Sequence, residues 1–256
     1  MKVLVIGDSC IDKFIYCNIE RICPEAPVPV MNPIRETSNP GMAHNVVKNL
    51  NSLNIEADLI TNPEQITKTR YVDNRSGQMV VRIDKNDTCK RIGIENTLTT
   101  TQWDIYEAVI ISDFCKGFIT EDDIAYIAQS HPLTFMDTKK QLGNWCNNVS
   151  FIKINEFEHK KNFELLPNYP QIQNKLIITR GKEGCEHMGK IYSVPPVSVK
   201  DVSGAGDTFL AALVYGYMIK NDLESAIRCA NMCASTVVQK SGTYALRKED
   251  VNDILF

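Results

Sequence analysis

The chain has 256 residues, of which 43% are hydrophobic and 23% charged, with a formal net charge of −3 at pH 7. This length suits one α/β domain with a small appendage, or two small domains, and the composition is typical of a soluble globular protein. The net charge does not indicate the basic surface that nucleic-acid binding needs, and no run approaches the roughly 18 apolar residues of a membrane span. The N-terminal strand is too short for a signal peptide and is followed too early by an acidic residue.

The cysteine pattern bears on the compartment. Nine cysteines are scattered along the chain without a Cys-x-x-Cys spacing. Buried small thiols explain them better than a metal site or a disulfide framework does. We therefore expect reduced thiols in a cytoplasmic protein.

The first element is an apolar run, residues 2–7, without strict alternation, which predicts a strand covered on both faces in a parallel sheet. Asp8 and Asp12 follow it. Ligands bind beyond the carboxyl ends of such strands, so both are well placed for a site, although a turn with solvated acids explains the pair equally well. Residues 13–35 hold short β-type runs separated by prolines, which predict a sheet edge or a separate flap.

The rest of the chain alternates between strand and helix patterns. Predicted strands cover residues 55–60, 108–112, 133–136, 151–154 and 176–179, with hairpins at 67–84 and 185–194 and a short β-type run at 197–199. Predicted helices run from about 40 to 53, from Thr120 onward, over about 205–219 and 223–239, and over 247–255. The alternation implies a mostly parallel sheet with right-handed crossovers.

Residues 201–208 read Asp-Val-Ser-Gly-Ala-Gly-Asp-Thr and precede an apolar helix. A Gly-x-Gly loop at a helix start leaves N–H groups free to bind an anion. Asp207 beside such a site suits phosphoryl transfer, because it can take a hydroxyl proton while the N–H groups of Gly204, Ala205 and Gly206 hold the transferred charge. The alternative is a helix N-terminus with two permissive glycines and an acid that complements the dipole.

The wider string resembles the C-terminal signature of the ribokinase (PfkB) family of carbohydrate kinases, Asp-Thr-x-Gly-Ala-Gly-Asp, with Val202 in place of Thr. In that family the last Asp is the catalytic base, which implies this role for Asp207. Pro-Gly-Met-Ala-His-Asn is similar to the N-terminal signature Pro-Gly-Gly-Ala-x-Asn, which implies that Gly41 and Asn45 hold the sugar. Met42 departs from it, and a side chain there would narrow the pocket or strain the loop if φ is positive.

A narrower resemblance is to the bacterial heptose-7-phosphate kinases of the same family. Arg-Ile-Cys-Pro-Glu-Ala-Pro-Val-Pro-Val at residues 21–30 is similar to a proline-spaced string of those kinases, and the hairpin at 67–84 resembles their lid. The resemblance implies a small β-sheet lid from about 13–36 and 67–86 that closes over the sugar and pairs across a homodimer. A helix and strand that family members usually carry after residue 60 are missing.

The resemblance also implies substrate contacts. Asp12 would hold the sugar, and Ser-Asp-Phe-Cys-Lys-Gly, similar to the family's Ser-Asp-Tyr-x-Lys-Gly, would bring Asp113 to a hydroxyl and Lys116 to a phosphate. Arg70 and Arg82 fit phosphate because a guanidinium fork matches its oxygens. Solvated faces of a hairpin explain either arginine equally well.

Nucleotide and metal contacts are implied in the same way. Asn155 and Glu158 form the family's Asn-x-x-Glu, associated with Mg²⁺ and phosphate, whereas a helix cap is the plainer interpretation of the two alone. We also expect Lys153 at the nucleotide, the resemblance places Thr179, Gly181 and Gly242 beside it, and Asn231 lies on a small-residue helix face that could admit the adenine of ATP.

Together these motifs predict a single ribokinase-like α/β/α domain over residues 1–256. The implied reaction is Mg²⁺-assisted transfer of the ATP γ-phosphoryl group to a sugar phosphate, closest to D-glycero-D-manno-heptose 7-phosphate at O1. Another sugar, or a nucleoside, is the first alternative. A non-catalytic sugar-phosphate or nucleotide sensor is the second, which the intact Asp207 disfavours. We expect no fused nucleotidyltransferase, no nucleic-acid partner and no membrane partner.

Overall fold

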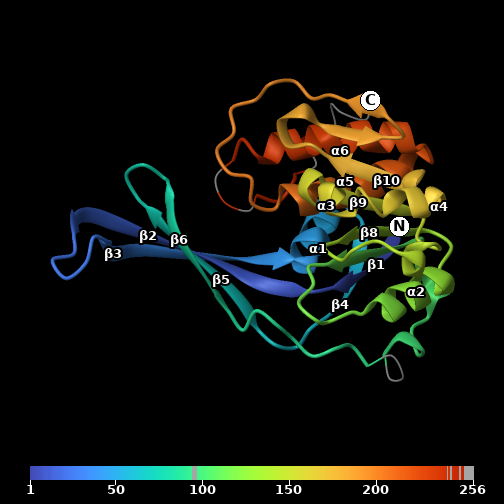
Figure 1. Cartoon of the computed structure of the whole chain (residues 1–256), viewed down its shortest axis with the longest axis horizontal. Helices are drawn as coiled ribbons and strands as arrows, with labels where there is room; N and C mark the ends of the chain where they lie inside the picture. Colours follow the sequence, from blue (N-terminus) through green and yellow to red (C-terminus); the bar gives the residue numbers. More distant parts are fainter. Residues whose placement is uncertain (94–96, 241, 243, 248, 251–256) are drawn as a thin grey trace.

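The computed structural model describes residues 1–93, 97–240, 242, 244–247 and 249–250, and these form two sheets (Figure 1). The larger sheet has the spatial order β12 (Lys190–Tyr192), β11 (Cys185–His187), β10 (Leu176–Thr179), β9 (Phe151–Asn155), β8 (Thr134–Thr138), β7 (Ala108–Asp113), β1 (Lys2–Gly7) and β4 (Glu56–Thr61). The strands from β10 to β4 are parallel, and β11 and β12 add an antiparallel edge. The predicted mostly parallel sheet is confirmed.

Helices cover both faces of this sheet (Figure 1). In β1, Val3 and Val5 pack in a core with α1 (Ala43–Ser52), α5 (Ala205–Lys220) and α6 (Leu223–Val237). Leu4 and Ile6 point the other way, into a core with α2 (Glu121–Ser130) and α4 (Pro170–Gln173). Burial on both faces explains why the strand is a continuous apolar run. Further helical segments are α3 (Glu156–Asn162) and 3₁₀ turns at Trp103–Ile105, Asn144–Cys146, Leu166–Asn168 and Gly181–Glu183, among others in the described part of the chain.

The smaller sheet projects from the body as an arm (Figure 1). Its order is β3 (Pro29–Met42), β2 (Ser9–Ile22), β5 (Ile66–Asp73) and β6 (Met79–Lys85). Only Asp8 separates β2 from β1, and β3 runs directly into α1. Pro29, Pro33 and Pro40 lie in the edge strand β3, which tolerates a missing N–H better than a central strand does, and Pro24 and Pro27 lie in the turn between β2 and β3. We call this sheet the lid.

Strand register decides which lid side chains share a face. In the pairing of β2 with β5, Asp12 lies opposite Lys68 and Phe14 opposite Arg70. In the pairing of β5 with β6, Lys68 lies opposite Asp84 and Arg70 opposite Arg82. Directly opposed residues point to the same side, so these side chains define one face, which we call the inner face. Val81 and Ile83 belong to the opposite, outer face.

Several expectations from the sequence need correction. The strands β2 and β3 are far longer than the short runs expected within residues 13–35, because they pair along nearly their whole length through two irregularities. Residues 197–199 join no strand. The predicted helix at 247–255 lies largely outside the described residues. Within the described part of the chain, no helix combines the length and apolar character that a membrane crossing needs.

Candidate active site

The loop before α5 has the backbone conformation that its glycines predict. Gly204 adopts a left-handed conformation with φ of 79° and is the N-cap of α5, which has no side-chain cap. The N–H of Ala205 donates to the carbonyl of Val202 at 3.2 Å, so Gly204 and Gly206 have the freer N–H groups of the expected three. Both glycines line a pocket of about 570 Å³ with Asp207. The helix N-terminus therefore faces a cavity large enough for phosphate groups.

Asp207 lies in the first turn of α5 and is 8% exposed. The amide nitrogen of Asn45 in α1 donates to its carboxylate at 2.9 Å. Burial raises the pKa of Asp207 to about 7; the Asn45 hydrogen bond opposes this rise, and the Asp137 and Asp12 charges add to it. A carboxyl group that titrates near neutral pH is suited to accept a proton at physiological pH.

The root of the lid, where β2 and β3 join the body, brings two expected sugar contacts, Asp12 and Gly41, near this carboxylate. Asp12 is buried and forms an ion pair with Arg70. Gly41 lies so close to Asp12 that a Cβ atom would overlap the Asp12 carboxylate and the Cys10 thiol. The expected strain at Met42 is present, since its φ is 58° and its side chain is buried against Cys10. A glycine is therefore replaced here at a positive-φ position.

Gly41→Ala is expected to raise the KM for the acceptor about tenfold or more with less effect on the KM for ATP. The added methyl group must displace Asp12 and disturb its pair with Arg70. Steady-state kinetics with each substrate varied in turn would measure both constants. Gly93→Ala is the matched control, because a Cβ atom at Gly93 meets nothing within 4 Å. An unchanged acceptor KM in Gly41→Ala contradicts the placement of the acceptor at Asp12.

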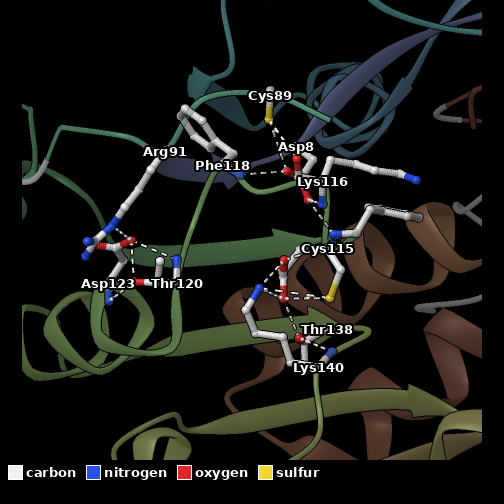
Figure 2. Close-up of polar contacts among 12 residues, drawn as sticks. Asp8, Cys89, Arg91, Cys115, Lys116, Phe118, Thr120, Asp123, Thr138 and Lys140 are labelled. Atoms are coloured by element: carbon white, nitrogen blue, oxygen red, sulfur yellow. Dashed lines mark hydrogen bonds and ion pairs between the residues drawn. The ribbon is translucent and has the colours of Figure 1, made fainter. Parts of the chain in front are cut away.

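The loop after β7 is pinned to the root of the lid by Asp8 (Figure 2). The Asp8 carboxylate accepts N–H groups from Phe114 at 2.7 Å, Lys116 at 3.3 Å and Phe118 at 3.3 Å. Burial raises the pKa of Asp8, and these N–H groups oppose the rise. Asp8 thus positions the segment that carries Phe114 and Lys116.

Asp113 and Lys116, which the sequence predicted to contact the substrate, each bind other side chains of the protein in this structure. Asp113 is 1% exposed, and its carboxylate accepts from Thr138 at 2.6 Å, from Lys140 at 2.9 Å and from the N–H of Cys115. Its oxygens therefore have partners within the protein, and its contact with a sugar hydroxyl stays a prediction. The Lys116 ammonium pairs with Asp87 at 2.6 Å. Figure 2 shows Thr138 and Lys140 below the loop.

A network of four charged groups lies at the carboxyl ends of β8 and β9. Lys153 is buried and pairs with Asp137 at 2.6 Å, and Lys139 bridges Asp137 at 3.3 Å and Glu158 at 2.5 Å. Burial alone would raise the pKa of Asp137, but the two ammonium groups lower it. A Cβ atom on Gly206 would lie 3.0 Å from the Lys153 ammonium. The smallness of Gly206 therefore lets this cation reach the anion-binding loop.

Asn155 and Glu158 form a helix cap, which is the role that these two residues suggest when they are considered without the family resemblance. The Asn155 side chain accepts the N–H of Glu158, and the Glu158 carboxylate accepts the N–H of Asn155, at the start of α3. No group of three or more His, Cys, Asp or Glu side chains that could hold a metal occurs among the described residues. Asp137 and Glu158 are nevertheless hard oxygen donors beside the pocket. They fit Mg²⁺ held through its own water molecules, the usual mode for this ion.

The expected nucleotide contacts separate into two groups. Lys153, Thr179 and Gly181 line the pocket with the loop residues. Asn231 is buried and donates to the carbonyl of Tyr192 at 2.7 Å, and the N–H of Gly242 donates to Asp201 at 3.0 Å. Neither of these two lines the pocket, so the structure does not bring them to it.

Sequence reasoning gave no site role to three residues that the structure brings to the pocket. Asp137 and Lys139 belong to the charged network, and Phe114 forms a wall of the pocket. Their position in the sequence could have identified them as site candidates, because each lies at or just beyond the carboxyl end of a predicted strand. Their partners are distant in sequence, which pattern reasoning alone does not reveal.

A parallel sheet with helices on both faces, and an acid at an anion-binding helix N-terminus, suit phosphoryl transfer to a hydroxyl. Residues 121–250 match the model described as pfkB family carbohydrate kinase. The chain belongs to this family and is a phosphotransferase. This confirms the resemblance found in the sequence.

Individual proteins extend the comparison. The "Bifunctional protein HldE" of Helicobacter pylori (strain P12) is 30% identical, with 99% of this chain and 66% of that protein covered. The chain spans about 65% of the length of the curated relatives that it matches. The ribokinase of Thermotoga maritima has a TM-score of 0.73 at 15% identity, covering 99% of this chain and 98% of that one. The Arabidopsis thaliana ribokinase complexed with ribose and ATP has a TM-score of 0.69 at 14% identity, covering 99% and 98%.

Proposed function

We propose that this chain transfers the γ-phosphoryl group of ATP to a hydroxyl of a sugar phosphate, with D-glycero-D-manno-heptose 7-phosphate, phosphorylated at O1, as the acceptor. The observation that carries the chemistry is Asp207, a buried carboxylate at the anion-binding end of α5 with its pKa raised to about 7. The choice of acceptor is supported by the proline-spaced string at residues 21–30 and by the lid hairpin. The nine free thiols support the cytoplasm as the compartment.

In this mechanism Asp207 takes the proton from the attacking hydroxyl, while Asn45 fixes the orientation of its carboxylate. The N–H groups of Gly204 and Gly206, with the positive end of the α5 dipole, hold the charge of the transferred group. Lys153 reaches the same loop as a charged hydrogen-bond donor, although it shares the Asp137 carboxylate with Lys139. Mg²⁺, held through water near Asp137 and Glu158, would neutralise phosphate charge.

The test is an assay of ADP formation with Mg²⁺ and ATP over a panel of acceptors: heptose 7-phosphate, hexose phosphates, free sugars and nucleosides. We expect turnover to be highest on heptose 7-phosphate, with phosphate found on O1 by ³¹P NMR. Turnover on a nucleoside alone would reject the proposed acceptor. ATP binding without turnover on any acceptor would favour the sensor.

A second acceptor class, another sugar or a nucleoside, is favoured by one observation. Met42 places a buried side chain in a left-handed backbone position beside Gly41, where the related signature has a second glycine. This side chain changes the shape of the sugar side of the site. The acceptor panel decides between the two classes.

We also propose that two copies of the chain pair through their lids. Every residue of β6, an edge strand of the lid, is exposed. Among them Met79, Val81 and Ile83 are 52%, 38% and 51% exposed. An edge strand that exposes apolar side chains is normally covered or blocked, because it otherwise invites aggregation. A second lid is a partner of matching shape and polarity.

Val81→Lys is expected to convert a dimer into a monomer, because it places a charge within the outer apolar face. Light scattering after gel filtration would measure the mass of each variant. Val199→Lys, at an exposed valine outside the lid, is the control and should keep the dimer mass. A wild-type protein that elutes as a monomer at micromolar concentration contradicts this pairing.

A further inference from the structure

The cations expected to bind an acceptor phosphate are already neutralised within the protein. Arg70 forms an ion pair with Asp12, Arg82 with Asp84 at 2.9 Å, and Lys116 with Asp87 at 2.6 Å. A phosphate that approached any of them would have to compete with a carboxylate already in place. Favourable binding of an anion requires positive charge that the protein has not compensated.

Lys68 is a half-buried cation of the lid that forms no ion pair with any residue that the structure describes. Its place on the inner face follows from the register, because it lies opposite Asp12 on β2 and two residues before Arg70 on β5. The Lys68 ammonium also opposes the effect of burial, which raises the pKa of the Cys10 thiol to about 12. Lys68 is therefore close to the lid root, where the acceptor contacts gather.

One aromatic ring connects Lys68 with the phosphoryl-transfer pocket. The Lys68 ammonium lies 5.7 Å from the centroid of the Phe114 ring, and the Lys139 ammonium lies 5.3 Å from the same centroid. The distance between the Lys68 and Lys139 ammonium groups therefore cannot exceed the sum of these two distances. Phe114 and Lys139 line the pocket with Asp207. Phe114 therefore contacts Lys68 and also lines the pocket that holds Asp207.

We propose that Lys68 binds the anionic group that the acceptor already carries, and so makes the site selective for phosphorylated over unphosphorylated sugars. This rests on the proposed function and adds the residue that distinguishes the two substrate classes. The ligand is a phosphate monoester dianion, which a lysine binds as a point charge. Phe114 favours the ammonium by a cation–π contact and holds it near the pocket before substrate arrives.

The test compares Lys68→Met with Lys85→Met. Lys85 is an exposed lid lysine opposite Thr67, so it lies on the outer face. Each variant and the wild type are assayed with heptose 7-phosphate and with the same heptose without phosphate. Lys68→Met should raise the KM for the phosphorylated sugar about tenfold to a hundredfold, the usual size of a charge-assisted hydrogen bond. It should leave kcat and the KM for the unphosphorylated sugar within about twofold, since no chemistry is assigned to this residue. Lys68→Arg should retain most of the selectivity.

The outcomes separate this inference from the proposed function. Wild-type turnover of heptose 7-phosphate tests the function, whereas the ratio of the two KM values tests Lys68. An equal rise of both KM values in Lys68→Met, or the same rise in Lys85→Met, overturns the role of Lys68 and leaves the kinase assignment standing. A wild type that prefers the unphosphorylated sugar overturns the role of Lys68 together with the proposed acceptor.

Discussion

Asp207→Asn is expected to lower kcat at least about a hundredfold while leaving the dissociation constant of ATP nearly unchanged, as is usual when a general base is removed. Asparagine can still accept the Asn45 hydrogen bond, which is 2.9 Å long in the native site, but it cannot take the hydroxyl proton. Single-turnover kinetics and equilibrium titration of ATP would measure the two effects. Turnover close to that of the wild type would remove Asp207 from the mechanism.

The pH dependence gives an independent readout of the same residue. The base must be deprotonated to act, so wild-type activity should rise with pH and level off above about 7, the pKa of Asp207. Because the folded protein holds this proton more tightly than the unfolded chain, Asp207 also makes wild-type stability fall as pH rises from about 4, the usual carboxyl pKa, to 7. The melting temperature of Asp207→Asn should therefore exceed that of the wild type at pH 8 and approach it at pH 4.

Lys153→Met is expected to destabilise the fold by about 3–5 kcal/mol, the usual cost of breaking a buried ion pair. Asp137 would stay buried with only Lys139, at 3.3 Å and 30% exposed, to balance it. Urea unfolding followed by circular dichroism would measure the free energy. Nucleotide affinity should also fall, because Lys153 is the buried cation that reaches the Gly206 loop.

A double variant distinguishes charge balance from lost packing. Lys153→Met combined with Asp137→Asn removes both members of the pair and leaves no uncompensated buried charge, so part of the stability should return. Nucleotide affinity should not return, because the cation is still missing. A double variant as unstable as Lys153→Met would show that packing of the lysine stem, not charge, accounts for the loss.

The sequence was sufficient for features set by local pattern. The apolar run at Val3 to Ile6 predicted a doubly covered strand because each face meets its own core. The two glycines before Asp207 predicted an anion-binding helix start, and the prolines of the lid predicted a sheet edge or a separate flap, since both depend only on backbone chemistry.

What the sequence could not provide is the pairing of charges across long separations. Asp113 was expected to bind a sugar, but Lys140, 27 residues later, takes up its carboxylate. Lys68 lies in the lid hairpin that the resemblance identified, but it received no site role, because the absence of a carboxylate partner is a property of three-dimensional neighbours. The length of β2 and β3 was equally hidden, since a sheet with a solvated face needs no continuous apolar run.

The near-continuity of β1 with β2 has a mechanical consequence. A lid attached through a flexible loop can move as a rigid body by rotation about a few backbone dihedral angles. This lid has no such loop, because its strands β2 and β3 continue almost directly into β1 of the central sheet and into α1. Asp8 also holds the root of the lid to the loop after β7 by hydrogen bonds. Its movement must be distributed as small changes of twist over many residues, so its stiffness is a property of the whole ribbon.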